Sequence, residues 1–465
     1  MRYYRMKKDV KNLRISYVGG GSHGWAWSLM RDLAMESELC GTISLYDINF
    51  QAAKENEIIG NRLSMRDEVK SRWKYESVES IDAAMKNADF VVISIMPATI
   101  DEMGSDVHAP EKYGIYQSVG DTVGAGGLLR AMRTIPMYEV IAEAIKRNCP
   151  NAWVINYTNP MTVCTRTLYR VFPKIKAFGC CHEVFGTQHL LTYVLEDIEG
   201  IKGTTRFDIK ANVLGINHFT VIDKATYKNY DMTDSIKKFA EKYHATGVVM
   251  PGGGDYTKSP FHSNNRIKLD FVKRYGVLGA AGDRHLAEFM PTKMYLANPE
   301  VVDEWKFQLT TISYRKQSNR KAQTERLVSG EEQMDITVSG EEGVKQIKAL
   351  CGVGEEFITN VNVPNLGQLE GAPMDSIVES NTVFGHDSLR PVFSGAQPLP
   401  LQALTNRHIL NQEGIIDATL KGDLNYAYQV FTNEPSLGGL TSVQVKDLFE
   451  TMVNNTKDYL QVFFK

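Results

Sequence analysis

Four consecutive residues in "GCCHEVFGTQ", Cys180, Cys181, His182 and Glu183, carry side chains that could bind a metal ion or form a nucleophile with its base. In both roles cysteine acts as the thiolate. His218, in "GINHFT", directly follows an apolar, strand-like stretch. It is either a hydrogen-bonded core residue or a partner of Cys181, because thiolate and imidazole together suit a first-row cation. The residues alone leave these alternatives open.

A glycine-rich turn near the N-terminus predicts a dinucleotide site. In "YVGGGSHGW", Gly19, Gly21 and Gly24 fit the pattern G-x-G-x-x-G between a strand-like and a helical stretch. Such glycines let backbone N–H groups approach a pyrophosphate at a helix N-terminus. Asp47 ends the next apolar strand, where an acid can hold the ribose hydroxyls and favours NAD over NADP. The candidate cofactor-binding residues are Gly19, Gly20, Gly21, Ser22 and Asp47. The alternative is a tight turn without a ligand.

Alternating helical and strand-like segments must position these residues. Helix followed by strand recurs in residues 80–97 and 137–161, and residues 174–183 look like a further strand. This order is typical of a doubly wound parallel sheet, that is, of an α/β Rossmann domain. Ligands of such sheets bind outside the carboxyl ends of the strands. We therefore expect Asn156, Asn159, Cys181 and His182 at the same edge as the dinucleotide phosphates.

The pattern changes near residue 200, which divides the chain into two predicted domains. Residues 1–200 form the NAD-binding Rossmann domain, and residues 201–465 form a C-terminal α+β domain. The second assignment depends on "FDIKANVLGINHFTVIDKATY", where apolar and polar residues alternate as in paired strands. The Gly- and Pro-rich residues 243–265 suit a mobile flap or a disordered loop.

Three further segments carry charged residues whose roles stay open. In "SVGDTVGAGGLLRAMRTIP" (118–136), Asp121 and Arg130 could contact substrate, or the segment could be a flexible surface loop. "GAAGDRHLAEFMP" (279–291) runs from a loop into a helix, for which Asp283 could be the N-cap. "SYRKQSNRKAQTERL" (313–327) is most simply a solvated helix face.

Composition excludes several partners. The 465 residues are 43% hydrophobic and 23% charged, with a formal net charge of −3, so we expect neither nucleic acid nor a membrane as partner. The basic N-terminus lacks the apolar core of a signal peptide, and the longest apolar run, residues 90–96, is too short to span a bilayer. Six cysteines without regular spacing are expected to be thiols in a cytoplasmic protein.

Taken together, the motifs resemble those of glycoside hydrolase family 4. The resemblance covers nearly the whole chain, in the order "YVGGGSHGW", "SVGDTVGAGG", "INYTNPM", "GCCHEVFG", "GINHFT", "GDRHLAEFMP" and "NVPNLGQ". It implies an NAD- and divalent-metal-dependent glycosidase with a C-terminal domain like that of lactate and malate dehydrogenases. The "CHEV" sequence resembles the uronate-cleaving branch. Branches that act on 6-phospho-sugars carry "CDMP" or "CNVP" there, and neutral glycosidases tend to "CHS".

The resemblance also implies roles for individual residues. Cys181 and His218 would bind Mn²⁺, which also grips the sugar hydroxyls at C2 and C3. The reaction would proceed by oxidation at C3, elimination across C1–C2, water addition and re-reduction, so that NAD is not consumed. His182 would protonate the leaving group, and Asp283 would be the base at C2, with Tyr275 as the alternative. Substrate-binding residues would include Asn159 and Asp121, the latter touching substrate or metal-bound water.

For the substrate, the resemblance implies α-galacturonides. The alternatives are α-glucuronides, neutral α-galactosides or α-glucosides, a malate-type dehydrogenase acting on 2-hydroxy acids, and a non-catalytic NAD(H) sensor. A guanidinium recognises a carboxylate better than an ammonium does, so Arg284, or failing it Arg130, would bind the uronate. Either arginine could instead pair with Glu183 or Glu288. A homodimer or homotetramer is expected from the resemblance alone.

Overall fold

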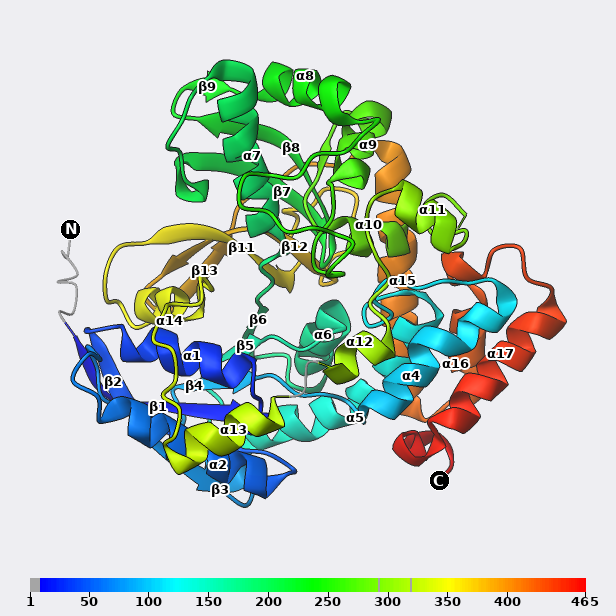
Figure 1. Ribbon diagram of the computed structural model, residues 1–465. Coiled ribbons are helices and arrows are strands. Elements are labelled where there is room, and N and C mark those ends of the chain that lie inside the picture. Colours follow the sequence, from blue (N-terminus) through cyan, green and yellow to red (C-terminus); the bar gives the residue numbers. More distant parts are fainter. Residues whose placement is uncertain (1–8, 292, 318–319) are drawn as a thin grey trace.

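The computed structural model describes residues 9–291, 293–317 and 320–465 (Figure 1). Within these residues the strands form one sheet of 13, and its N-terminal part is parallel in the order β3-β2-β1-β4-β5-β6. This is the Rossmann order, so the predicted doubly wound domain is confirmed. The six strands are β1 (Val10–Val18), β2 (Leu39–Tyr46), β3 (Lys74–Val78), β4 (Phe90–Ile93), β5 (Trp153–Asn156) and β6 (Lys176–Gly179).

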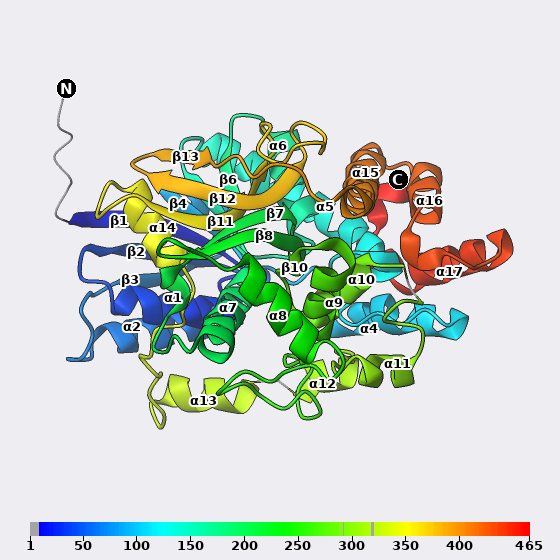
Figure 2. The same ribbon diagram turned by 90° about the horizontal axis from the view of Figure 1, so that it is seen from above.

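Helices cover both faces of the parallel sheet. Tyr17 of β1 belongs to one apolar cluster with Leu33 of α1 (Trp25–Ala34), and Ile59 of α2 (Phe50–Ser64) joins the same cluster. Val91 of β4 belongs to a second cluster with Leu168 of α6 (Met161–Val171) on the other face. Figure 2 shows α2 and α6 on opposite sides of the sheet. Because both faces are buried at the centre of the sheet, β4 and β5 are nearly continuous apolar runs.

The sheet continues beyond β6 with antiparallel strands, which confirms the predicted α+β character of the C-terminal half. β11 pairs with β6 at Asn362 and Gly179, and the order then runs β11-β12-β7-β8-β10, with β13 beside β12 and β9 beside β8. These strands are β7 (Ile209–Ile216), β8 (Phe219–Tyr227), β9 (Tyr230–Asp231), β10 (Leu278–Gly279), β11 (Phe357–Pro364), β12 (Ile377–Gly385) and β13 (Ser388–Pro391).

C-terminal helices pack against the Rossmann half. Ile415 of α15 (Leu399–Lys421), Phe431 of α16 (Leu424–Thr432) and Phe449 of α17 (Ser442–Asn455) share an apolar cluster with Met132. The two halves of the sequence therefore share a core as well as a sheet. The domain division at residue 200 stays a prediction. It coincides with the end of α7 (Glu183–Glu199), where Gly200 is left-handed.

The remaining helices complete the molecule. They are α3 (Ile81–Met85), α4 (Ile100–His108), α5 (Gly124–Asn148), α8 (Thr233–Tyr243), α9 (Arg266–Tyr275), α10 (Asp283–Phe289), α11 (Pro299–Glu304), α12 (Ile312–Gln317), α13 (Lys321–Ser329) and α14 (Gly343–Leu350), with 3₁₀ turns at Ala109–Tyr113, Arg206–Asp208, Pro435–Leu437, Lys457–Tyr459 and Gln461–Phe463. Among the described residues, no helix combines the length and apolar character that crossing a membrane requires.

The second glycine-rich segment differs from the flexible loop that its composition allowed. From Gly124 onward it is the first half of the 25-residue helix α5, and it is buried. A Cβ at Gly126 would lie 2.6 Å from the carbonyl oxygen of Asp106, and one at Gly127 would lie 2.6 Å from the carbonyl carbon of Thr122. The glycines are there because the backbone packs too closely for side chains.

Candidate active site

The glycine turn and Asp47 lie together at the carboxyl edge of the sheet. Gly19 follows β1 with φ +89°, and a Cβ there would lie 2.0 Å from the carbonyl oxygen of Ser94. Asp47 follows β2, and its Oδ2 accepts the N–H of Gly21 at 2.9 Å. Carbonyl groups of Gly20 and Ser22 accept from the Asn56 amide at 2.7 and 3.1 Å. The turn is therefore fixed from both sides.

The N-terminus of α1 fits an anion. No side chain caps it, and its first turn contains no acid, so its N–H dipole is not neutralised by the chain itself. At Gly24, the last glycine of the pattern, an added Cβ would meet nothing within 4 Å. Absence of a side chain at this position keeps the approach to the helix end open.

Cys181 and His218 both lie near Glu183. The charge of Glu183 acts on both groups, and Asn217, adjacent to His218 in the chain, lies against the thiol. His218 sits at the tip of the two-residue turn between β7 and β8 with φ +66°. A buried non-glycine residue in the left-handed region often marks a functional position.

Burial of the thiol and two nearby carboxyl groups favour the protonated form of Cys181 in the protein alone. Burial, then the charges of Glu379 and Glu183, raise the pKa of the thiol well above its ordinary value. Burial raises the pKa of Glu379 to about 7, although Asn360 donates to its Oε1 at 2.6 Å. Burial would also raise the pKa of Glu183, but His285 and Arg284 outweigh it and hold that pKa well below its usual range.

Glu183 connects α7 to the start of α10. Its Oε1 lies 3.3 Å from Nε2 of His285, and its Oε2 accepts the N–H of Gly282 at 2.7 Å. The His285 ring contacts the His218 ring at 3.8 Å between centroids, with the two planes tilted by 34°. Burial and the neighbouring His285 lower the pKa of His218 to about 3, so its imidazole is neutral and can be a metal ligand.

Among the described residues, no group of three or more His, Cys, Asp or Glu is arranged to hold a metal ion. A cation at Cys181 and His218 would need further ligands from substrate or water.

His182 is paired with an acid from a distant part of the chain. Its Nδ1 lies 3.0 Å from Oε1 of Glu341, and Glu341 directly precedes Glu342, the N-cap residue of α14. This hydrogen bond raises the pKa of His182 against the opposing effect of burial. The half-exposed ring is also near Trp25 of α1, with 5.9 Å between ring centroids. A protonated imidazole at the mouth of the site suits a proton donor.

Asp283 is buried at the start of α10 and does not cap it. The N-cap is Gly282, without a side-chain cap, so the interpretation of Asp283 as the cap is wrong. Its Oδ1 accepts the N–H of Lys268 at 3.2 Å, and its Oδ2 has no partner within hydrogen-bonding geometry among the described residues. Burial raises the pKa of Asp283, while the nearby Lys268 ammonium lowers it. Such a carboxylate is a stronger base than an exposed one.

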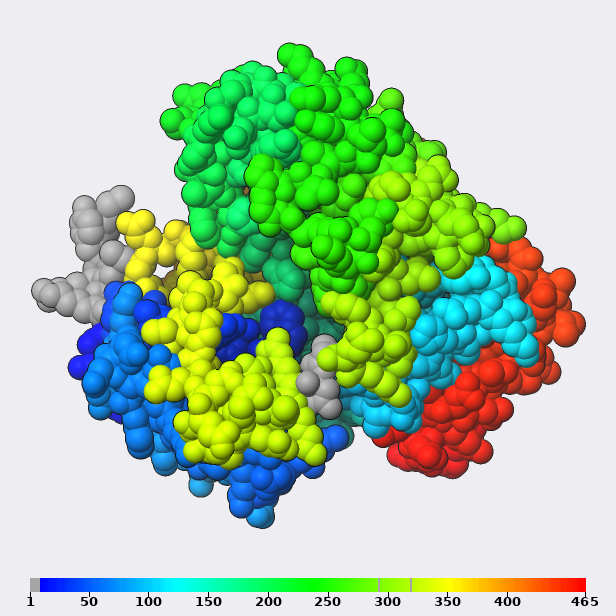
Figure 3. Space-filling model, in the orientation of Figure 1, coloured from blue at the N-terminus to red at the C-terminus, as the bar shows by residue number. Residues whose placement is uncertain are grey.

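A cavity of ≈300 Å³ lies beside Asp283 and His182. His182, Glu183, Lys268, Asp283 and Arg284 all line it, together with residues of the 249–265 loop. Figure 3 shows the surface hollowed between the green residues near 250–290 and the yellow-green residues after 310. The alternative base, Tyr275, is not a lining residue. It lies at the other end of α9, edge-on to Phe271.

Arg284 and Arg130 occupy different positions at this site. The Arg284 guanidinium stacks on Phe261 at 4.3 Å from the ring centroid, and its Nη1 donates to Thr310 at 3.1 Å. Arg130 is buried, and its Nε donates to the carbonyl oxygen of Asn159 at 3.0 Å. Among the described residues, neither arginine forms an ion pair with Glu183 or Glu288.

Several buried polar atoms of these elements have no hydrogen-bond partner among the described residues. They are Nη1 of Arg130, Oδ1 of Asn159, Oδ2 of Asp283, Nδ1 of His285 and Oε2 of Glu288. Buried polar groups are normally paired. A cluster of unpaired ones is expected where a ligand completes the hydrogen bonds.

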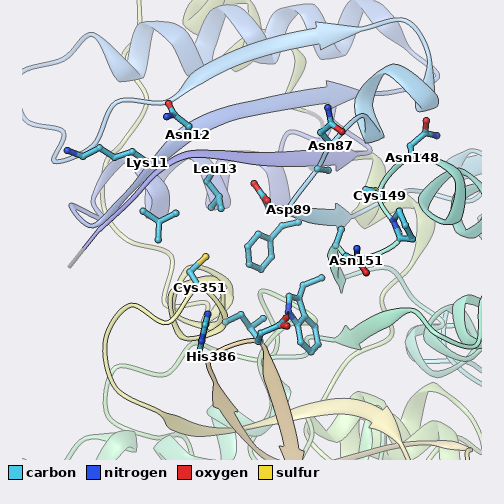
Figure 4. Close-up of a pocket in the computed structure, with 18 residues that line it drawn as sticks. Lys11, Asn12, Leu13, Asn87, Asp89, Asn148, Cys149, Asn151, Cys351 and His386 are labelled. Carbon is cyan, nitrogen blue, oxygen red and sulfur yellow. The ribbon is translucent and has the colours of Figure 1, made fainter. Parts of the chain in front are cut away.

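A larger cavity, of ≈680 Å³, lies at the opposite ends of the strands and contains none of the predicted site residues (Figure 4). Its two aspartates are already hydrogen-bonded within the protein. Asp89 accepts the N–H of Arg14, and Asp387 accepts from Trp153 and Lys176. We assign no ligand to it.

Four site residues were missed by sequence reasoning. Arg315 belongs to the segment interpreted as a solvated face, but it is partly buried, donates to the carbonyl oxygen of Val119 and lies 4.0 Å from Asp121. That interpretation is wrong for Arg315, and residues 318–319 of the segment lie outside the described part. The others are Lys268, Glu341 and Glu379. A lysine and a glutamate between apolar neighbours, in "RIKLD" and "IVESN", were available signals for Lys268 and Glu379. "GEEG" carries no signal for Glu341.

Known protein families match both halves of the chain. Residues 14–197 match the model of the Family 4 glycosyl hydrolase, and residues 213–437 match that of the Family 4 glycosyl hydrolase C-terminal domain. The chain belongs to glycoside hydrolase family 4. The expected enzyme class is thereby confirmed.

Individual family 4 proteins are similar over the full length. The alpha-galacturonidase of Thermoanaerobacterium saccharolyticum is 55% identical over 99% of this chain and 98% of its own. The crystal structure of lplD from Bacillus subtilis is 47% identical and superposes with a TM-score of 0.91 over 95% of this chain and 100% of that one. A 6-phospho-alpha-glucosidase from gut microorganisms, solved in complex with NAD and Mn²⁺, shares the fold at 17% identity, with a TM-score of 0.79 over 96% and 99% of the two chains.

Proposed function

We propose that this family 4 glycosidase hydrolyses α-galacturonides with NAD and Mn²⁺ as cofactors. The observation that carries the substrate class is the similarity to an alpha-galacturonidase at 55% identity over 99% of the chain. Family membership favours glycoside hydrolysis over a malate-type dehydrogenase or a non-catalytic NAD(H) sensor. α-Glucuronides remain the nearest alternative, and neutral α-galactosides and α-glucosides are the next.

The residues present fit both cofactors. Gly19, Gly21 and Asp47 form a closely packed turn beside the uncapped N-terminus of α1, which suits the pyrophosphate and ribose of NAD. Cys181 and His218 supply sulfur and nitrogen donors for Mn²⁺. When bound, the two cofactors supply the removal and return of a hydride at the sugar C3 and the polarisation of the C3 oxygen.

Side chains of the cavity perform the remaining steps. Oxidation at C3 makes the proton at C2 acidic, and Asp283 accepts that proton. Elimination then breaks the bond from C1 to the leaving oxygen, to which His182, supported by Glu341, donates a proton. Asn159 and Asp121 contact the substrate. Water adds to the unsaturated sugar before C3 is reduced again. The homodimer or homotetramer stays an expectation.

A carboxylate at the substrate's C6 needs a cation that the protein does not already neutralise. Of the lysine and the arginine that line the cavity, Lys268 donates from Nζ to Asn265 at 2.9 Å and lies close to Asp283. Arg284 forms no ion pair among the described residues, and its stacking on Phe261 holds the guanidinium flat. We propose Arg284 as the residue that binds the uronate.

The substrate comparison tests this assignment. Wild-type protein is expected to prefer p-nitrophenyl α-galacturonide over the glucuronide, the neutral α-galactoside and 6-phospho-glycosides. Arg284→Leu should lower kcat/KM about 10- to 150-fold on the galacturonide, because a charge-assisted pair is lost. On the neutral galactoside the same variant should change far less. Arg284→Lys keeps the positive charge but loses the planar guanidinium. Its kcat/KM on the galacturonide should lie between those of wild type and Arg284→Leu. A wild-type preference for neutral or phosphorylated glycosides would remove the uronidase proposal.

A further inference from the structure

The Thr122 hydroxyl lies between a carboxylate and the His218 ring. Its Oγ1 donates to Oδ1 of Asp121 at 2.9 Å and lies 2.9 Å from Nδ1 of His218. Thr122 and His218 are both buried. Nε2 of His218, the other ring nitrogen, has no hydrogen-bond partner within the part of the chain that the structure describes.

Hydrogen counting assigns the direction of both bonds. A hydroxyl has one hydrogen to donate, and an ionised carboxylate can accept but not donate. The Arg315 guanidinium, 4.0 Å from Asp121, keeps that carboxylate ionised. The Thr122 hydrogen therefore goes to Asp121, and the Thr122 oxygen must accept from Nδ1–H of His218. A neutral imidazole carries one N–H, so its lone pair is then on Nε2.

The loop that carries Thr122 is held on several sides. Oε1 of Glu288 accepts the N–H groups of Val119 and Gly120, each at 2.7 Å. The carbonyl oxygen of Ser118 accepts the N–H of Thr310 at 2.8 Å. These bonds come from α10 and from the segment before α12. A loop fixed in this way holds the Thr122 oxygen between Oδ1 of Asp121 and Nδ1 of His218.

We propose that Thr122 is a positioning residue that holds His218 as the Nδ1–H tautomer and so leaves the Nε2 lone pair for the metal ion. The inference rests on the proposed function, because it assigns Thr122 a role toward the metal expected at Cys181 and His218. Partners that orient metal-binding histidines typically change metal affinity 10- to 100-fold when they are removed.

Two variants of similar size separate this role from packing. Thr122→Val keeps the shape but cannot accept a hydrogen bond, and Thr122→Ser keeps the hydroxyl. The readouts are the Mn²⁺ dissociation constant, from titration of the metal-free protein, and the His218 tautomer, from ¹⁵N NMR of histidine-labelled protein without metal. NAD binding reports whether each variant is folded. We expect Thr122→Val to bind Mn²⁺ about 10- to 100-fold more weakly and Thr122→Ser to bind within about 3-fold of wild type.

The outcomes distinguish failure of the inference about Thr122 from failure of the proposed function. An Nε2–H tautomer in the wild-type protein would overturn the inference, even if Thr122→Val does not fold. Equal Mn²⁺ affinity of Thr122→Val and wild type would also overturn it. Wild-type protein that binds NAD but no Mn²⁺ would instead contradict the proposed function, while the tautomer would still test the role of Thr122.

Discussion

Replacing Cys181 by serine is expected to lower glycosidase activity about 10³-fold or more, with little change in NAD affinity. A thiolate is lost from the proposed metal site, and metal ions contribute several kcal/mol to stabilising developing charge. NAD affinity should be retained because the glycine turn and Asp47 are built from β1, β2 and α1. Activity is measured with excess Mn²⁺, and NAD binding by titration calorimetry.

The adjacent cysteine provides the control. Cys180 is buried in the apolar cluster of the Rossmann half, and its Sγ donates to Oε1 of Gln346 at 2.9 Å. Cys180→Ala should therefore reduce stability slightly and leave the metal requirement unchanged. Inactive Cys180→Ala together with active Cys181→Ser would mean that the ligand is the other cysteine.

Replacing Asp283 by asparagine is expected to lower kcat about 10²- to 10⁴-fold, the usual contribution of a general base. The amide has almost the same shape, can still accept the N–H of Lys268, and cannot take a proton from C2. Substrate deuterated at C2 should slow the variant more than it slows the wild type, because proton removal becomes rate-limiting.

Tyr275→Phe is the matched comparison for the alternative base. Since Tyr275 does not line the cavity, its kcat should stay within about 3-fold of wild type, as for a substitution away from the reacting atoms. A severe loss in Tyr275→Phe with a mild one in Asp283→Asn would reverse the assignment of the base.

The fold was predictable because its signals are local. The glycine turn after β1, the acid after β2 and the repeated order of helix and strand identify a Rossmann sheet without knowledge of distant contacts. Gly126 and Gly127 were ambiguous because glycine is common both in loops and where backbones touch. The close contacts of these glycines with Asp106 and Thr122 show that the segment is packed rather than a loop. Those contacts form only in the folded protein.

The candidate site was predictable in part. Cys181, His182, His218 and Asp283 lie in short, distinctive motifs. The structure places Cys181 and His218 near Glu183, and His182 and Asp283 line one cavity with Glu183. Glu341 and Arg315 reach the site from segments far along the chain. Their local patterns are those of any charged surface, so the partners of His182 and Asp121 could be identified only from the folded arrangement.

One measurement tests the central claim most directly. Protein freed of nucleotide and divalent metal is incubated with p-nitrophenyl α-galacturonide, with NAD⁺ and Mn²⁺ added separately and together. We predict aglycone release only when both are present, without accumulation of NADH. Release that needs neither cofactor, or net NADH formation from a 2-hydroxy acid in place of aglycone release, would contradict the proposed function.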